Sequence, residues 1–329
     1  MPQQNRNLYS LLPLFALLVT TACTKDGAQA EAKEVPAIEL AQAQPKGDIA
    51  PSANPLLWRI APKEGKGQAS HLYGTIHIPD DRVLALPKVV TQAVDGCAEL
   101  YTEIPMDMST QLSLAPRMML PGEETLDKIL PEKLYSRLSK LFDEKGLPLA
   151  PLSKMKVWAI TTQVVLLDHL MEFASKQPLD MVLYKRAEQA GKPVAGLETV
   201  EEQISVFDEL SQDEQIRMLE QTLDLMAEFK AKGTDPVKEL LEAYLSGEDK
   251  QLLDAMLESY DPTNELDRKV MKRLFSDRNE LMTQRIAKKL SASGGKPLFF
   301  AVGAGHLVGD EGMVALLRKA GYTVERVKP

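Results

Sequence analysis

The pattern of hydrophobic and polar positions divides the chain into two strand-bearing ends and a helical middle. Short apolar runs of the kind that form buried strands occur near both ends, and a helical stretch follows in each half. The predicted strands are residues 56–60, 70–78, 98–104, 297–302 and 322–327, and the helices are residues 87–95 and 311–320. We therefore expect both ends to contribute strands to one mixed sheet.

The region between these ends is predicted to be a large helical insertion. Ser153 has the character of an N-cap for a helix whose apolar face runs from Val157 to Met171. Further helical patterns cover residues 178–190, 211–230, 235–245 and 264–290, and one short strand covers residues 193–197. The fold class is accordingly α/β, with a mixed central sheet, flanking helices and a helical middle insertion.

The first 22 residues have the pattern of a secretory signal peptide. Arg6 precedes an apolar run from Leu8 to Val19. This run has about twelve residues, whereas a helix that crosses a bilayer needs about 20. We therefore expect this segment to direct export and to be removed.

The end of the signal resembles a bacterial lipobox, Val19-Thr-Thr-Ala-Cys23, with Thr20 where Leu is usual. This predicts a lipid on Cys23 and a protein held on a membrane of the cell envelope, facing the periplasm or the extracytoplasmic space. The alternative is ordinary cleavage after residues 28–30. Residues 23–54 contain few large apolar side chains and are predicted to be a disordered tether, so the folded domain is residues 55–329.

Composition limits the partners. The 329 residues are 44% hydrophobic, enough for a substantial core, and 39 basic against 47 acidic residues give a net charge of -8. The chain has no basic run that could neutralise a phosphate backbone. We therefore expect no nucleic-acid partner.

Two of the four histidines occur in matching Gly-x-x-His motifs, Gly74-Thr-Ile-His77 and Gly303-Ala-Gly-His306. Chance would place a glycine three positions before at least two of four histidines about 2% of the time. Each motif follows an apolar strand, and the glycine is expected to end it by adopting a conformation closed to other residues. His77 and His306 are thus expected at the rim of the sheet, where ligands bind, and two imidazoles suit divalent Mn, Co, Zn or Fe.

Carboxylates are needed to complete such a site, and two are candidates. Glu103 ends a predicted inner strand, where an unpaired charge is costly. Glu198 follows the short strand at residues 193–197. Its alternative role is that of an acidic residue at the start of the next helix. His71 and His169 are expected to be ordinary hydrogen-bonded histidines.

With these residues in place, the chain resembles the TraB/PrgY/GumN family, which includes the Tiki proteases and shares a superfamily with ChaN-like and erythromycin-esterase-like proteins. The resemblance covers about residues 55–328. It rests on Leu72-Tyr-Gly-Thr-Ile-His77, Glu103, Ala190-Gly-Lys-Pro-Val194, Gly196-Leu-Glu-Thr199, Glu202-Gln203, Arg278-Asn279, Met282 and Val302-Gly-Ala-Gly-His-Leu307. It implies a metal-dependent hydrolytic site that uses Mn or Co, with His77, Glu103 and His306 at its core.

Further roles follow as hypotheses. Glu103 or Glu198 would act as general base, and Arg278 would bind a substrate carboxylate or an oxyanion, unless it forms an ordinary surface ion pair. Asn279 matches the family pattern without a defined role. The substrate would be a peptide or another small envelope molecule. The competing hypotheses are a protein that sequesters a peptide, a metal or haem without hydrolysis, and an envelope scaffold that retains a relic site.

Overall fold

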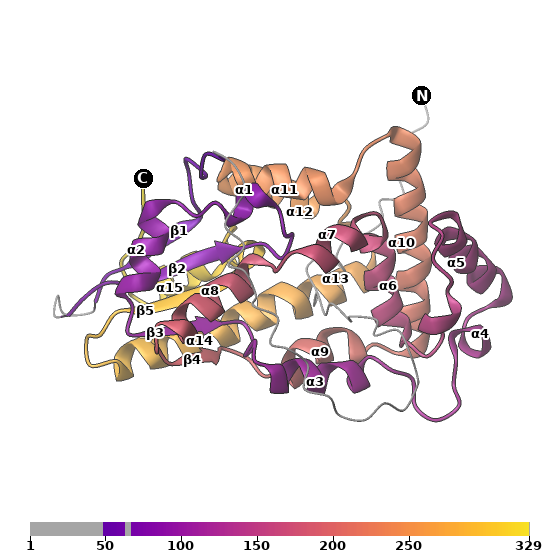
Figure 1. Cartoon of the computed structure of the whole chain (residues 1–329), viewed down its shortest axis with the longest axis horizontal. Coiled ribbons are helices and arrows are strands. Elements are labelled where there is room, and N and C mark those ends of the chain that lie inside the picture. Colours follow the sequence, from indigo (N-terminus) through magenta and orange to yellow (C-terminus); the bar gives the residue numbers. More distant parts are fainter. Residues whose placement is uncertain (1–48, 63–66, 329) are drawn as a thin grey trace, which may run out of the picture.

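A six-stranded mixed sheet forms one half of the domain (Figure 1). The computed structural model describes residues 49–62 and 67–328. The strands, in chain order, are β1 (Leu57–Ile60), β2 (Ser70–Thr75), β3 (Glu99–Thr102), β4 (Val194–Gly196), β5 (Leu298–Gly303) and β6 (Val324–Arg326). Their order in space is β4-β3-β5-β2-β1-β6. The first four are parallel, and β1 is antiparallel to both β2 and β6. The predicted fold class is confirmed.

The central strand β5 is buried on both faces of the sheet. Its residues Leu298 to Val302 are all buried and apolar, as expected for a strand with helices on both faces. Thr75 pairs with Gly303 and Tyr101 with Phe300, an odd separation along β5, so Thr75 and Tyr101 point to opposite faces.

Two helices cover these two faces. On the face of Thr75 lies α8 (Leu179–Gln189), whose Asp180 accepts a hydrogen bond from the Thr75 hydroxyl. On the face of Tyr101 lies α14 (Asp277–Ala292), whose Lys289 Nζ is 4.0 Å from the centre of the Tyr101 ring. Helix α2 (Lys88–Gly96) packs beside α8, and α15 (Met313–Lys319) packs on α14 and β6. The sheet is therefore the middle of three layers.

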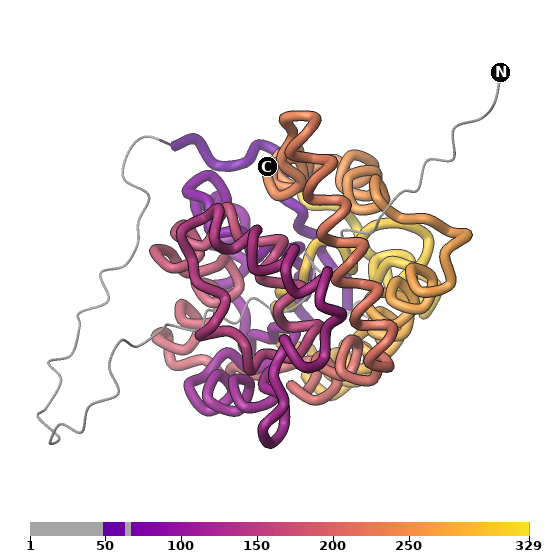
Figure 2. Tube along the Cα trace, turned by 90° about the vertical axis from the view of Figure 1, so that its right-hand side faces the viewer, coloured from indigo at the N-terminus to yellow at the C-terminus, as the bar shows by residue number. Residues whose placement is uncertain are grey.

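The helical insertion forms the other half of the molecule, and Figure 2 looks onto it. Its core is the pairing of α6 (Val157–Leu166) with α10 (Gln212–Lys232), and Trp158 stacks on Phe207 nearby. The remaining helices are α1 (Asp81–Leu84), α3 (Met108–Arg117), α4 (Leu126–Ile129), α5 (Glu132–Glu144), η3 (Ala150–Leu152), η4 (Leu167–His169), α7 (Leu170–Ser175), α9 (Val200–Asp208), α11 (Pro236–Ser246), α12 (Asp249–Leu257), α13 (Glu265–Met271), η5 (Lys272–Ser276) and η6 (Ala304–His306).

Three helix expectations need correction. The N-cap of α6 is Lys156, because Ser153 belongs to the turn that closes η3. The predicted helix at residues 264–290 is divided into α13 and α14 by the π-helical turn η5. Helices α1, α3, α4, α5 and α12 lie outside the predicted helical patterns. Helix α3 buries only Leu114 and α4 only Leu126, which is too little to mark a helix in the sequence.

The N-terminal predictions fall mostly outside the described residues. The signal peptide, Cys23 and the tether up to residue 48 belong there. Asn54, the last residue of the predicted tether, is fixed, because its Nδ2 donates to the carbonyl of Gly247 (2.9 Å) at the end of α11. Within residues 49–62 and 67–328, no helix combines the length and the apolar character needed to cross a membrane.

The glycines of the two Gly-x-x-His motifs serve close packing. Gly74 is not among the positive-φ glycines and Gly303 has a φ of -50°, so the expectation of a conformation closed to other residues is wrong. A Cβ on Gly74 would lie 3.0 Å from the Cβ of Ala304 and 3.1 Å from Leu307 Cδ1. A side chain at Gly74 would thus push the turn that carries His306 away from β2.

Replacing Gly74 should therefore destabilise the sheet. We expect Gly74→Val to lower the free energy of unfolding by about 1–3 kcal/mol, because extra methyl groups would overpack this contact. Urea denaturation followed by circular dichroism measures the change. Gly96→Ala is the control, since a Cβ at Gly96 meets nothing within 4 Å. Equal stability of the two variants would contradict the packing argument.

Candidate functional site

The two motif histidines lie at the same edge of the sheet. His77 follows β2 and His306 follows β5, and these strands are parallel neighbours whose last residues, Thr75 and Gly303, pair with each other. Both histidines line one cavity together with Glu103. The cavity leaves about 30 Å³ for the centres of water-sized molecules. The parallel register of β2 and β5 therefore brings the two motifs together.

His306 is a buried, neutral imidazole with one defined tautomer. Its Nδ1 is 2.6 Å from Asn279 Oδ1, and Asn279 Nδ2 donates to the carbonyl of Glu311 (2.9 Å). The amide orientation follows from these contacts, so Nδ1 carries the proton and Nε2 is an acceptor, which Arg278 Nη1 approaches to 3.2 Å. Burial, together with nearby Arg278, lowers the pKa of His306 to about 3. Its Nε2 is thus the atom available as a ligand or acceptor.

His77 is held in the same way from the other face of the sheet. Its Nδ1 lies 2.8 Å from Oδ2 of Asp180, a buried carboxylate on α8 that also accepts from Thr75. Because Asp180 can only accept, His77 Nδ1 donates, and Nε2 is the ring nitrogen that Asp180 does not hold. Burial alone would lower the pKa of His77, but the Asp180 carboxylate outweighs it and raises the pKa to about 9.

Glu103 is placed directly after β3 and is an ionised, buried carboxylate. Its Oε1 accepts from the backbone N–H of Gly303 (2.7 Å), and its Oε2 accepts from Gln203 Nε2 (2.9 Å). Burial opposes ionisation, but the Arg278 guanidinium outweighs it and holds the pKa of Glu103 well below its usual range. Gly303 permits this approach, since a Cβ there would lie 3.0 Å from Glu103 Oε1.

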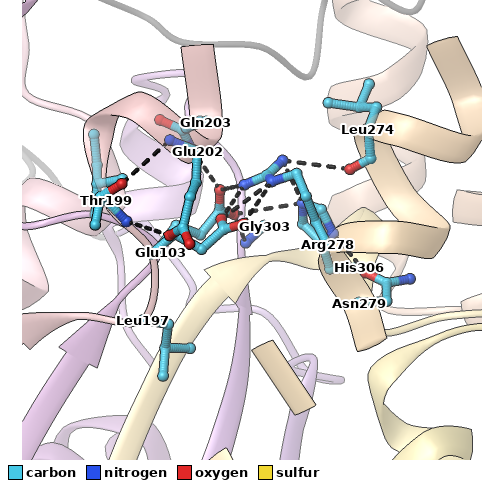
Figure 3. A network of polar contacts seen from close by, with 12 residues as sticks. Glu103, Leu197, Thr199, Glu202, Gln203, Leu274, Arg278, Asn279, Gly303 and His306 are labelled. Carbon is cyan, nitrogen blue, oxygen red and sulfur yellow. Dashed lines mark hydrogen bonds and ion pairs between the residues drawn. The ribbon is translucent and has the colours of Figure 1, made fainter. Parts of the chain in front are cut away.

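Arg278, on the first turn of α14, sits among these groups (Figure 3). Its Nη2 donates to Glu103 Oε2 and to Glu198 Oε2, both at 2.6 Å, and its Nε donates to Glu198. Its Nη1 is 3.2 Å from His306 Nε2 and 3.4 Å from the carbonyl of Leu274. These contacts engage all five N–H groups of the guanidinium. The expected alternative of a surface ion pair is wrong, because Arg278 is only 5% exposed.

Glu198 is the second carboxylate that pairs with Arg278. Both its oxygens accept from Arg278, and it lines a second cavity, with Glu202, Glu209 and Arg273, that the two histidines do not line. Burial raises the pKa of Glu198, and Arg278 opposes this shift only in part. Thr199 is the N-cap of α9, so Glu198 precedes the helix and is paired with Arg278.

The donor atoms at this edge fit a divalent ion in their chemistry. Two imidazoles whose Nδ1 atoms are held by outer groups, next to a carboxylate, match the way proteins support metal ligands. His306 Nε2 and Glu103 Oε1 are 3.8 Å apart. In the described part of the chain, no three His, Cys, Asp or Glu side chains are grouped closely enough to hold a metal. An ion would therefore require small side-chain rotations, including release of His306 Nε2 from Arg278.

Sequence reasoning missed Asp180. An acidic residue in the first turn of a helix is common because it favours the helix dipole, and this masked the signal. The better clue is that Asp180 is flanked by Leu179 and lies on the buried face with Leu183. Of the other histidines, His169 contacts Glu172 and Asp235, and neither His169 nor His71 lines the cavity.

The buried Arg278 cluster generates a stability prediction. We expect Arg278→Leu to cost about 3–5 kcal/mol of unfolding free energy, because two buried carboxylates lose their counterion. Adding Glu198→Leu should recover part of this loss. Arg285→Leu on the same helix is the control. Its pairing with Glu202 is part-exposed and its loss should cost about 1 kcal/mol or less. Equal losses in urea denaturation would contradict the assignment.

Comparison with known proteins identifies relatives of this fold. The chain is 27% identical to metalloprotease TIKI2 of Danio rerio over 84% of this chain and 61% of the relative. It is 26% identical to metalloprotease TIKI1 of Homo sapiens over 96% of this chain and 68% of the relative. It is also 30% identical to the uncharacterized protein YbaP of Shigella flexneri over 47% of this chain and 57% of that one. The chain thus spans about three fifths of the length of the TIKI2 protein. No solved structure matches.

The family model of the TraB/PrgY/gumN family matches residues 56–326. This range includes every strand of the sheet, both Gly-x-x-His motifs and the Arg278 cluster. The chain belongs to the TraB/PrgY/gumN family.

Proposed function

We propose that this protein is a divalent-metal-dependent hydrolase that cleaves peptides. The observation that carries the proposal is the convergence of His77 and His306 on one cavity. A helix on a different face of the sheet holds the Nδ1 of each imidazole, which leaves Nε2 as the ring atom that could bind a metal. Such support by outer groups is typical of metal-binding histidines.

The relatives support the same class of reaction. The TIKI proteins are named metalloproteases, and the similarity extends over most of this chain. We propose Mn or Co as the metal, as the family resemblance implies, while the nitrogen and oxygen donors also suit Zn or Fe.

The residues of the site have different proposed roles. His77 Nε2, His306 Nε2 and Glu103 would hold the ion, which when bound would polarise a substrate carbonyl and lower the pKa of a water molecule. Asp180 and Asn279 orient the two imidazoles. Arg278 keeps Glu103 ionised and Glu198 holds Arg278 in place, and we propose both as positioning residues, because the protein itself engages every Arg278 donor.

The competing hypothesis is a protein that binds a peptide, a metal or haem without hydrolysis. The Arg278 contact at His306 Nε2 favours the peptide-binding form of this alternative, because the contact must open before a metal ion or haem iron can bind there. Measuring the bound metal and the hydrolysis of peptides on the same sample distinguishes the two hypotheses.

The cell envelope is the proposed location. The sequence features that support it are the signal-like residues 1–22 and the lipobox-like segment that ends at Cys23. A lipid at Cys23 would attach the chain to a membrane, and its substrates would be peptides or other small molecules of that compartment.

The metal proposal predicts a selective effect of His77→Ala. The purified full-length chain should retain about one equivalent of Mn, Co, Zn or Fe by elemental analysis and should cleave short peptides after Mn or Co is added. His77→Ala should lose both properties, because a ligand is removed. His71→Ala, on the preceding strand β2 but outside the cavity, should keep both. Wild-type activity in His77→Ala would refute the assignment.

A substitution of Asp180 tests the metal site without removing a ligand. Asp180→Asn keeps the size of the side chain but weakens the hold on His77, so metal affinity measured by calorimetry should fall about 10–100-fold. Asp80→Asn, a substitution at the N-cap of α1, is the matched control and should leave the affinity unchanged.

The anchoring proposal predicts the behaviour of Cys23→Ser in the native host. Wild-type protein should sediment with membranes, and Cys23→Ser should move to the soluble extracytoplasmic fraction, because no acyl chain can attach. Cys97→Ser, at the buried cysteine of the domain, is the control. Equal membrane fractions for all three proteins would contradict a lipid on Cys23.

A further inference from the structure

The cavity at the two histidines has two unlike sides. One corner carries His77, Glu103 and His306. A second part of the lining, the wall, is apolar and is formed by residues of the loop after β2 and of helices α6, α7, α11 and α12. Its main residues are Ile76, Ile78, Leu166, Phe173, Leu240 and Leu252. Four of the six come from the helical insertion, so the insertion supplies most of the wall, and the segments that follow β2, β3 and β5 supply the polar corner.

We propose that this wall is a specificity pocket that receives an uncharged aliphatic side chain next to the bond that is cut. The inference rests on the proposed hydrolytic function and names its substrate class. A scissile carbonyl at the polar corner would place an adjacent side chain against the wall, because both surfaces belong to one cavity. The preference then depends on what the wall excludes as well as on what it contacts.

The lining of the cavity excludes charged side chains of the substrate. Apart from the three groups of the polar corner, no acidic, basic or histidine side chain lines the cavity. A lysine, arginine, aspartate or glutamate side chain of the substrate would be desolvated there without a counterion, which is costly. An aliphatic side chain loses no hydrogen bond on entry and buries apolar surface.

Size is limited as well. Space of about 30 Å³ for water centres corresponds to roughly two or three water molecules. Displacing that number makes room for a side chain such as that of valine or leucine, and not for an aromatic ring, unless the wall moves.

The wall is fixed to the turn that carries His306. A Cβ on Gly305 would lie 2.7 Å from Met256 Cε, so α12 packs directly on this turn. The hydroxyl of Tyr244, on α11, donates to the carbonyl of Gly74 (3.0 Å). These contacts hold the insertion against both motifs. The pocket should therefore discriminate by shape.

The test uses the full-length chain and a pool of peptides of random sequence, with cleavage sites identified by mass spectrometry. At one position beside the cut, valine and leucine should exceed aspartate, lysine and tryptophan about 10- to 100-fold in kcat/KM. Leu252→Phe should shift the preference toward alanine, and Leu252→Ala should shift it toward phenylalanine.

The neighbouring residue of the same helix supplies the matched control. Leu253 lies against Gly309 and does not line the cavity, so Leu253→Phe and Leu253→Ala should keep the wild-type preference. Melting curves show whether each variant is folded. Equal cleavage beside charged and aliphatic residues, or equal shifts for Leu252 and Leu253 variants, would overturn the pocket.

Binding to His77→Ala separates this inference from the proposed function. Fluorescent peptides that differ only in leucine, aspartate or lysine at one position are titrated onto this variant and onto wild type. Leucine-selective binding that Leu252→Phe weakens, without cleavage by wild type, would support the pocket and refute hydrolysis. Cleavage without selectivity would support hydrolysis and refute the pocket. Absence of both cleavage and selective binding would count against the pocket.

Discussion

The buried guanidinium of Arg278 is the interaction on which the rest of the site depends. Taking one cation and two carboxylates out of water costs several kcal/mol per ion unless each is paired. Arg278 compensates for this because it binds the ends of two strands, through Glu103 after β3 and Glu198 after β4, and contacts His306 after β5. One side chain on α14 thereby fixes the positions of three chain segments at the sheet edge.

The topology makes this convergence possible. Parallel strands present their carboxyl ends at one edge, so segments more than two hundred residues apart in the sequence, such as those of His77 and His306, become neighbours. The helical insertion covers part of that edge, because residues of α6, α7, α11 and α12 line the cavity there. The same arrangement gives one polar corner and one apolar wall to the cavity.

Much of the fold could be predicted from the sequence, since each strand is a distinct apolar run. The Gly-x-x-His motifs were found because two matching patterns follow two strands, and Glu103 because a charge ends an inner strand. Asp180 was missed because an acidic first turn is common in helices. The engagement of all five N–H groups of Arg278 and its pairing with Glu198 could not be predicted either. Both depend on which side chains from distant segments meet in three dimensions.

The two imidazoles are oriented by helices from opposite layers, His77 by α8 and His306 by α14. Neither helical layer alone can orient both imidazoles, so the two are held together only after the sheet has been enclosed on both faces. A half-folded chain would lack this arrangement. Completion of the three-layer fold is thus a precondition for any chemistry that needs both imidazoles, and local unfolding of either helical layer would abolish it.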